Sequence, residues 1–197
     1  MQRKPIFDAI RRLLGRGFKP SEVAALDAAI DSALRPDNPD PLAAPLEAGP
    51  DAIALIREFE GCARLRPDGR VEAYPDPGTG AAPWTIGWGA TGPGIGPGTV
   101  WSREECDARL MEDIARHAAD VRQAIGDAPT TQSQFDALVS FHFNTGAIAR
   151  ATLTRRHVAG DTAGAATEFV RWNRAGGRVL AGLTRRRAAE AALYLRG

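Results

Sequence analysis

The chain has 197 residues, 44% of them hydrophobic and 25% charged, which is the composition of a soluble globular protein. A chain of this length can bury about 70% of its unfolded surface, so its fold needs neither disulfide bonds nor a structural metal ion to be stable. No apolar run is long enough to span a bilayer. Arginines interrupt the apolar residues of the N-terminus, so no signal-peptide core is visible.

Charge is unevenly distributed along the chain, although its formal net value is only +1. Residues 145–197 contain ten arginines and three acidic residues, whereas residues 51–144 contain eight basic and fourteen acidic residues. A basic C-terminal segment attracts anionic partners at long range, and nucleic acid, a membrane surface and the cell wall all qualify. Charge alone does not choose among these three.

The chain contains two cysteines, Cys62 and Cys106, which are too few for a disulfide framework and lack the spacing of a metal site. A single bridge between them is one interpretation, and two small buried thiols is the favoured one. Because His117, His142 and His157 are scattered, we expect neither a metal centre nor another cofactor.

Residues 1–34 predict a helical hairpin. Apolar residues recur at helical spacing over residues 4–15, and a second apolar series follows Ser21, which is a plausible helix cap. The hairpin is too small to be stable by itself. A wall-anchoring module, a partner contact, a pair docked on the main domain and a membrane-surface helix all fit it. Residues 35–50 contain five prolines and few large apolar side chains, which predicts a linker.

Residues 51–197 form the expected main domain. A short helix to about Cys62 precedes a turn-rich region, with a hairpin turn at residues 67–69, a loop at 75–80 and a short strand at 84–89. A long helix opens at Ser102, because Glu105 follows at capping-box spacing. Further helices are expected at residues 131–143, 152–159, 161–173 and 182–195. One small sheet followed by a run of helices predicts an α+β fold.

The segment LIREFEGCARL, residues 55–65, places Glu58 and Glu60 two positions apart. At about 100° per residue, Glu60 lies within the apolar arc of the helix and Glu58 on the opposite, solvated side. Partial burial and the carbonyl end of the helix both favour the protonated form of Glu60, which is the form that a general acid needs. An ion pair with Arg57, or with an arginine of the C-terminal half, explains the same position equally well.

A general acid of this kind commonly works with a second carboxylate across the substrate. The candidates in the turn-rich region are Asp68, Glu72 and Asp76. Turn chemistry alone explains Asp68, and strand alternation makes Glu72 a solvated residue. Asp76 in YPDPG is also explained as a turn residue, and the residues alone favour that interpretation. Thr85 in WTIG is either a hydroxyl near a site or an ordinary β-branched strand residue.

Four segments of the main domain carry motifs that are specific in combination. The first comprises EG at 60–61, AYPD at 73–76 and PWTIGWGATG at 83–92. The others are TQSQFDALVSFHFNTG at 131–146, LTRRHVAGD at 153–161 and AATEFVRWNRAGGRVLAGLTRRRAAEAALY at 165–194. Together, over about residues 51–195, they resemble the phage-type lysozymes of glycoside hydrolase family 24, in the order expected for that family.

Residue by residue, this resemblance assigns the catalytic glutamate of the family to Glu60, its aspartate to Asp76 and its threonine to Thr85. It implies a lysozyme-like α+β fold, with a small antiparallel β-sheet lobe and a mainly helical lobe. The implied activity is that of an endolysin muramidase. Such an enzyme cleaves the β-1,4 bond between N-acetylmuramic acid and N-acetylglucosamine in peptidoglycan, with inversion, and thereby lyses the bacterial cell.

The resemblance also implies partners and a location. The substrate partner is the glycan strand of peptidoglycan, and a phage or prophage endolysin of this kind waits in the host cytoplasm for holin-dependent release into the periplasm. We expect a monomer that binds no nucleic acid and does not insert stably into a membrane. Among the C-terminal arginines, we expect some to bind wall anions and others, such as Arg185 or Arg186, to pair with acids of the core.

The sequence departs from the family pattern in three places. Sixteen positions separate Glu60 from Asp76, which is more than usual for the family, and RPDGRVE enlarges the hairpin between them. GTGAAP enlarges the loop before Thr85, and Ala90 stands where members often have histidine. We expect these changes to alter the shape of the cleft more than the chemistry, and we interpret Ala90 as a repacked structural contact.

Two other classes of function fit parts of the sequence. One is a muramidase fold without catalysis that acts as a peptidoglycan-binding or protein-binding scaffold, which the presence of all three catalytic residue types disfavours. The other is a nucleic-acid-binding protein, suggested by the basic C-terminal segment. The sequence lacks the interleaved aromatic and basic residues of a nucleic-acid surface, so this second alternative is the weaker.

Overall fold

The computed structural model describes residues 4–19, 22–24, 26–27, 45–62, 64–76 and 79–197. The chain divides into two compact units, residues 1–44 and 45–197. In the first unit, α1 spans Lys4–Leu14, where the first helix was predicted, and the ring of Phe18 packs edge-on against Phe7. The second predicted helix and the predicted linker lie largely outside the described residues.

The second unit contains the helices that the sequence predicts. They are α3 (Pro50–Glu60), α4 (Arg103–Ile125), α5 (Gln132–Thr145), α6 (Thr152–Val158), α7 (Thr162–Glu168) and α8 (Ala181–Tyr194). The helix expected at 161–173 is shorter than predicted, because a 3₁₀ turn, η1 (Phe169–Trp172), replaces its last part. Within the described part of the chain, no helix is long and apolar enough to cross a membrane.

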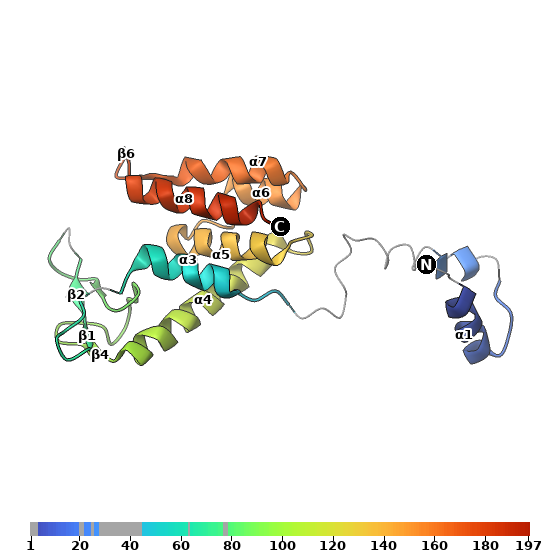
Figure 1. The fold of residues 1–197 in the computed structure, drawn as a ribbon, viewed down its shortest axis with the longest axis horizontal. Helices are drawn as coiled ribbons and strands as arrows, with labels where there is room; N and C mark the ends of the chain where they lie inside the picture. The colour runs from blue at the N-terminus through green and yellow to red at the C-terminus, as the bar shows by residue number, and fades with distance from the viewer. Residues whose placement is uncertain (1–3, 20–21, 25, 28–44, 63, 77–78) are drawn as a thin grey trace. The chain divides into compact units, whose positions relative to one another are not determined.

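Helix α5 lies at the centre of the helical lobe, where it packs against α3, α4 and α8 (Figure 1). Every residue from 134 to 142 is buried, and Phe135, Leu138 and Phe141 are fully enclosed. A helix that is buried all round cannot show a single apolar stripe. Its N-terminus is instead fixed by a reciprocal capping box between Thr131 and Gln134. The predicted capping box of α4 is also present, between Ser102 and Glu105.

The β lobe consists of two antiparallel pairs of short strands, where the sequence predicted one small sheet. β1 (Val71–Glu72) pairs with β4 (Val100–Trp101), and β2 (Tyr74–Pro75) pairs with β3 (Trp84–Thr85). Pro75 has no backbone N–H, which limits any wider hydrogen-bonded ladder at this point. The predicted turn at residues 67–69 is present, and the Asp68 side chain accepts a hydrogen bond from the Arg70 N–H.

A third antiparallel pair, which the sequence analysis did not predict, belongs to the helical lobe. β5 (Arg174–Ala175) and β6 (Arg178–Val179) are joined by Gly176 and Gly177. Both glycines have positive φ, at 54° and 75°, as the two central residues of a type I′ hairpin turn require. The Gly-Gly pair between two basic segments was the signal that could have revealed this hairpin.

The N-terminus of α3 is capped by a side chain from a different helix. Gly49, the N-cap residue, has no side chain to offer, and the carboxylate of Asp136 on α5 accepts hydrogen bonds from the Gly49 and Ala52 N–H groups at 2.8 and 3.4 Å. A Cβ atom at position 49 would lie 2.6 Å from this carboxylate, so glycine is needed for the approach. Gln132 donates to the same carboxylate at 2.7 Å. Asp136 therefore anchors the start of α3 to the central helix.

We predict that Asp136→Ala lowers the free energy of unfolding by about 2–3 kcal/mol, because it removes charge-assisted hydrogen bonds from a buried and a partly buried N–H group. Asp127→Ala is the matched control, since Asp127 is exposed, and it should change stability by no more than about 0.5 kcal/mol. Denaturant unfolding of both variants measures the difference. Equal stabilities would show that Asp136 does not anchor α3.

Candidate active site

Glu60 is the last residue of α3, and Gly61 ends the helix with a positive φ of 63°. The Glu60 side chain is 23% exposed, whereas Glu58 points into solvent. Ile56, one turn before Glu60, is fully buried in the core. The predicted difference between the two glutamates is therefore confirmed, and only Glu60 turns toward the interior.

Glu60 forms an ion pair with Arg186 of α8, whose Nη1 donates to Glu60 Oε1 at 2.6 Å. The alternative interpretation of Glu60, an ion pair with an arginine of the C-terminal half, is thus confirmed as a contact. Arg57, the other partner considered, pairs instead with Asp107 at 3.2 Å and lies over the ring of Trp88. Trp88 Nε1 also donates to Asp107, at 2.7 Å, so this group joins α3, the segment after β3 and α4.

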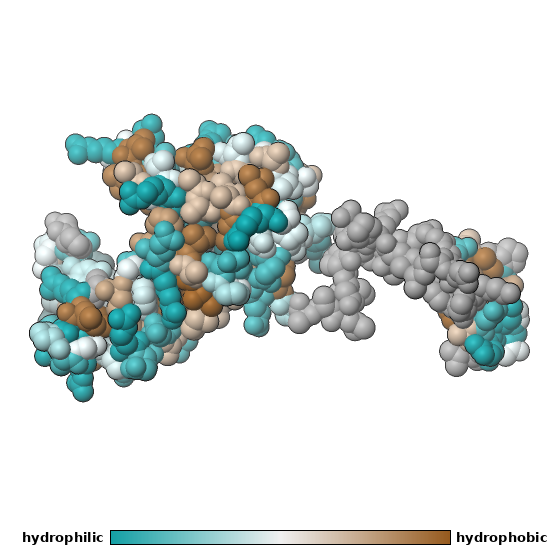
Figure 2. All heavy atoms as spheres, viewed as in Figure 1, coloured by the Kyte–Doolittle hydropathy of each residue, from teal (hydrophilic) through white to brown (hydrophobic). Residues whose placement is uncertain are grey.

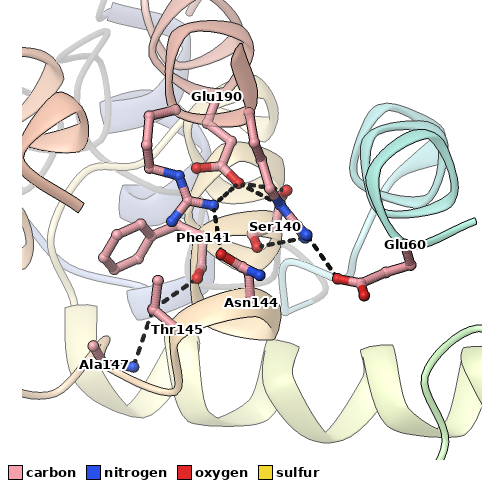
Figure 3. Close-up of polar contacts among 9 residues, drawn as sticks. Glu60, Ser140, Phe141, Asn144, Thr145, Ala147 and Glu190 are labelled. Carbon is pink, nitrogen blue, oxygen red and sulfur yellow. Dashed lines mark hydrogen bonds and ion pairs between the residues drawn. The ribbon is translucent and has the colours of Figure 1, made fainter. Parts of the chain in front are cut away.

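Behind Glu60 lies a buried network of charged groups (Figure 3). Glu190 is fully buried, and its Oε1 accepts from Arg186 Nε at 3.2 Å, from Arg187 Nη2 at 2.8 Å and from Ser140 Oγ at 2.8 Å. Arg187 also donates to Asn144 Oδ1, at 3.2 Å. The network comes from the two helices α5 and α8. Arg186 is the residue through which it reaches Glu60.

Burial and charge oppose each other within this network. Burial raises the pKa of Glu190, while the charges of Arg187 and Arg186 act in the opposite direction. Burial lowers the pKa of Arg187, against the effect of Glu190. Within the described part of the chain, Glu190 Oε2 and Arg187 Nε and Nη1 are buried without a hydrogen-bond partner. These groups are costly to bury, so they are not explained by stability alone.

The second oxygen of Glu60 faces a glycine turn. Ile86 and Ala90 exchange backbone hydrogen bonds at 2.9 and 3.0 Å across residues 87–89. Gly89 has a φ of 97°, and a Cβ atom there would lie 3.6 Å from Glu60 Oε2. Gly87 has a φ of 63°, and a Cβ atom there would lie 2.8 Å from Cys106 Sγ. Glycine at position 87 lets the backbone of this turn lie against Cys106 of α4, whereas at position 89 it is the positive φ that favours glycine.

The two cysteines lie next to this turn as free thiols, and only Cys106 is fully buried, whereas Cys62 is half-buried. Burial raises the pKa of Cys106 to about 11. Burial raises the pKa of Cys62 as well. Ala90, at the position where the resemblance indicated that members often have histidine, is buried in the same cluster as Cys106. This small apolar contact is consistent with the structural role predicted for position 90.

Thr85 lies on β3, and Asp76 lies just beyond the end of β2, the strand that pairs with β3. Tyr74 is the register partner of Thr85, and Asp76 directly follows β2. The Asp76 N–H donates to Pro83 O at 3.0 Å, and its Oδ1 accepts from the N–H and hydroxyl of Thr79 at 2.9 and 3.1 Å. Asp76 therefore has the turn role that its sequence context predicts, and its carboxylate is oriented by Thr79. The strand pair leads into the turn at residues 86–90, which reaches Glu60.

These elements lie at one end of the helical lobe, where the surface is hollowed between that lobe and the β lobe (Figure 2). The sequence analysis singled out Glu60, Asp76 and Thr85 but missed Glu190. A signal was present, because Glu190 follows Arg186 and Arg187 at helical spacing and precedes the apolar residues Leu193 and Tyr194 at the same spacing. A charged set within the core-facing stripe of α8 indicates a buried network.

The sequence matches the family described as Phage lysozyme over residues 57–190, which include most of the main domain. The chain belongs to the phage lysozyme family. The endolysin of Bacillus phage B103 is 39% identical over 147 residues, which cover 74% of this chain and 52% of the relative. The endolysin of Acyrthosiphon pisum secondary endosymbiont phage 1 is 38% identical over 148 residues, which cover 72% of this chain and 93% of the relative.

Solved structures confirm the lysozyme-like α+β fold. The muramidase domain of SpmX from Asticaccaulis excentricus is 32% identical with a TM-score of 0.64, and the match covers 76% of this chain and 97% of that one. The endolysin from Escherichia coli O157:H7 phage FAHEc1 is also 32% identical, with a TM-score of 0.63, and covers 76% and 93%. The chain spans about half the length of the Bacillus phage endolysins that it matches, and nearly the whole length of these two structures.

Proposed function

We propose that this member of the phage lysozyme family is an endolysin muramidase that hydrolyses the β-1,4 bond between N-acetylmuramic acid and N-acetylglucosamine in peptidoglycan. The observation that carries the proposal is the placement of Glu60. One of its oxygens is held by Arg186, and the other faces the glycine turn that follows Thr85. A carboxyl group that is held by an arginine and is still 23% exposed suits transfer of a proton to a bound glycan.

In the proposed mechanism, protonated Glu60 is the general acid. It donates its proton to the glycosidic oxygen as the bond to the anomeric carbon breaks and positive charge develops on the sugar ring. Asp76, in its ionised form, stabilises that charge. The hydrogen bonds from Thr79 to Asp76 Oδ1 hold the carboxylate in place. Protonation of the leaving oxygen by Glu60 completes departure of the sugar.

We assign to Asp76 and Thr85 the role of orienting the water that acts as the nucleophile. The β2–β3 register supports this, because it brings Thr85 beside Tyr74, two residues before Asp76. A carboxylate just beyond one strand and a hydroxyl on the neighbouring strand can together orient one water, and the carboxylate accepts the proton that the water releases. Attack by that water on the face opposite the leaving group gives inversion at the anomeric carbon.

The substrate is a polyanion, since peptidoglycan carries carboxylates, and an exposed basic hairpin lies at the edge of the helical lobe. Arg174 and Arg178, on β5 and β6, are both exposed. Leu180 N–H donates to Asn173 O, so the hairpin closes directly before the start of α8. Helix α8 then carries Arg186 into the site. We assign to these hairpin arginines the attraction of wall anions, whereas Arg186 serves the buried network.

Kinship with phage endolysins supports the rest of the biological role. We propose that the protein waits in the host cytoplasm, passes the membrane after holin action and cleaves the wall from the periplasm as a monomer. Residues 1–50 lie outside the family match.

We predict that Glu60→Gln lowers the release of reducing ends from purified peptidoglycan by at least about 100-fold, because the amide keeps the shape of the side chain and cannot supply the proton. Glu58→Gln is the matched control. It changes an exposed glutamate two positions earlier and should retain full activity. Thermal unfolding should show both variants folded.

If Glu60→Gln retains nearly wild-type activity, the general acid is misassigned. If the wild-type protein itself releases no reducing ends but still sediments with peptidoglycan, the scaffold alternative holds.

We predict that the first product formed from the β-linked glycan is the α-anomer, because the water attacks from the side opposite the leaving oxygen. Proton NMR of the anomeric region during the first turnovers measures this, before mutarotation mixes the anomers. Initial appearance of the β-anomer would contradict inversion and assign Asp76 to a different step.

A further inference from the structure

The Arg186 guanidinium is shared between two carboxylates. Its Nη1 donates to Glu60 at 2.6 Å, and its Nε donates to Glu190 at 3.2 Å. Nη2 donates to the carbonyl oxygen of Ser140, at 3.3 Å. The three bonds use all three nitrogens of the guanidinium, and the side chain is only 3% exposed. Arg186 therefore has one fixed orientation, in which only Nη1 donates to Glu60.

The charge that Glu60 meets from this network depends on Glu190. Arg186 and Arg187 contribute two positive charges, and ionised Glu190 contributes one negative charge, which leaves +1 behind Glu60. Arg187 does not touch Glu60, but the two interact electrostatically. If Glu190 were neutral, the net charge of the network beside Glu60 would be +2. A more positive network stabilises the carboxylate form of Glu60 and removes the proton that the proposed reaction needs.

The other described groups around Glu60 do not offset the positive charge of Arg186 and Arg187. On α3 itself, Arg57 is paired with Asp107 of α4. From the β lobe, the turn at residues 86–90 presents the backbone of Gly89 to the second oxygen. From α5, Ser140 and Asn144 contribute uncharged groups to the network. Glu190 is therefore the anion that directly offsets the two buried arginines.

We propose that Glu190 is a positioning residue: it holds Arg186 and neutralises part of the buried positive charge, so that Glu60 keeps its proton to a higher pH than it would without Glu190. The inference rests on the proposed role of Glu60 as the general acid. It also accounts for a buried Arg-Glu-Arg group whose three unpartnered atoms are unfavourable for stability.

The test compares two substitutions that change the network charge in opposite directions. Glu190→Gln keeps an oxygen that can accept hydrogen bonds but raises the charge behind Glu60 to +2. Arg187→Gln lowers that charge to zero and leaves Arg186 in place. The measurement is kcat/KM for release of reducing ends as a function of pH, made on the full-length chain.

We predict that the alkaline limb of the profile moves to lower pH by about one unit in Glu190→Gln and to higher pH in Arg187→Gln. On the alkaline side of the wild-type limb, Glu190→Gln should therefore be about tenfold less active. Opposite displacements cannot come from general loss of stability, which would lower activity at every pH.

Glu168→Gln is the matched control. Glu168 is also buried, and it forms ion pairs with two arginines, Arg156 at 3.5 Å and Arg171 at 3.3 Å. It is the last residue of α7 and does not lie beside Glu60. It should lose stability as Glu190→Gln does, with no displacement of the limb. If neither Glu190→Gln nor Arg187→Gln displaces the limb, Glu190 is only structural and the inference is overturned.

A direct titration separates the inference from the proposed function. Carbon-13 NMR of the full-length protein labelled at glutamate side-chain carboxyls, with Glu60→Gln used for assignment, follows the Glu60 proton without any substrate. We predict the same two displacements in this titration. If they occur in a protein that cleaves no glycan, the inference holds and the muramidase proposal fails. If they are absent in an active enzyme, only the inference fails. Because Arg187→Gln retains Glu190, it also provides the test if Glu190→Gln does not fold.

Discussion

The contact between Arg186 and Glu60 is the constraint on which the site depends. It joins the end of α3 to the second turn of α8, and it requires both helices to pack against α5. A guanidinium that is almost fully buried needs a compensating charge and hydrogen-bond acceptors, which Glu190, Glu60 and the Ser140 carbonyl supply. The position of Glu60 is therefore set by the packing of three helices, and not by the local chain alone.

Helix α3 is fixed by charge at both of its ends. At its N-terminus, the Asp136 carboxylate accepts from backbone N–H groups, and at its C-terminus the guanidinium of Arg186 holds Glu60. Both arrangements follow the direction of the helix dipole, with an anion at the start and a cation at the end. The glycine turn at residues 86–90 then closes on Glu60 from the β lobe. Small displacements of the proton donor are thus opposed from three directions.

Much of this could be predicted from the sequence, because the relevant signals are local. The inequivalence of Glu58 and Glu60 follows from helical spacing, the start of α4 follows from Ser102 and Glu105, and the motifs of the main domain identified the family. These features depend on residues within one or two turns of each other. They needed no knowledge of how the helices pack.

The rest could not be predicted, because it depends on contacts between distant segments. The sequence analysis expected Arg185 or Arg186 to pair with acids of the core, but only packing of α8 on α5 selects Arg186 as the partner of Glu60. The spacing of Glu190 on α8 places it on the core-facing side, but its contacts with Arg186, Arg187 and Ser140 are known only from the packing. The division of the β lobe into two strand pairs, and the capping of α3 by Asp136, also arise from tertiary contacts that no local pattern encodes.

The most direct test of the account is a crystal structure of the Glu60→Gln variant with a peptidoglycan fragment bound between the lobes. The account predicts that a glycosidic oxygen lies within hydrogen-bonding distance of the side chain at position 60. It also predicts that Asp76 and Thr85 face the anomeric carbon from the opposite side, with a water between them. A fragment bound elsewhere, or bound with Asp76 and the side chain at position 60 on the same face of the sugar, would contradict it.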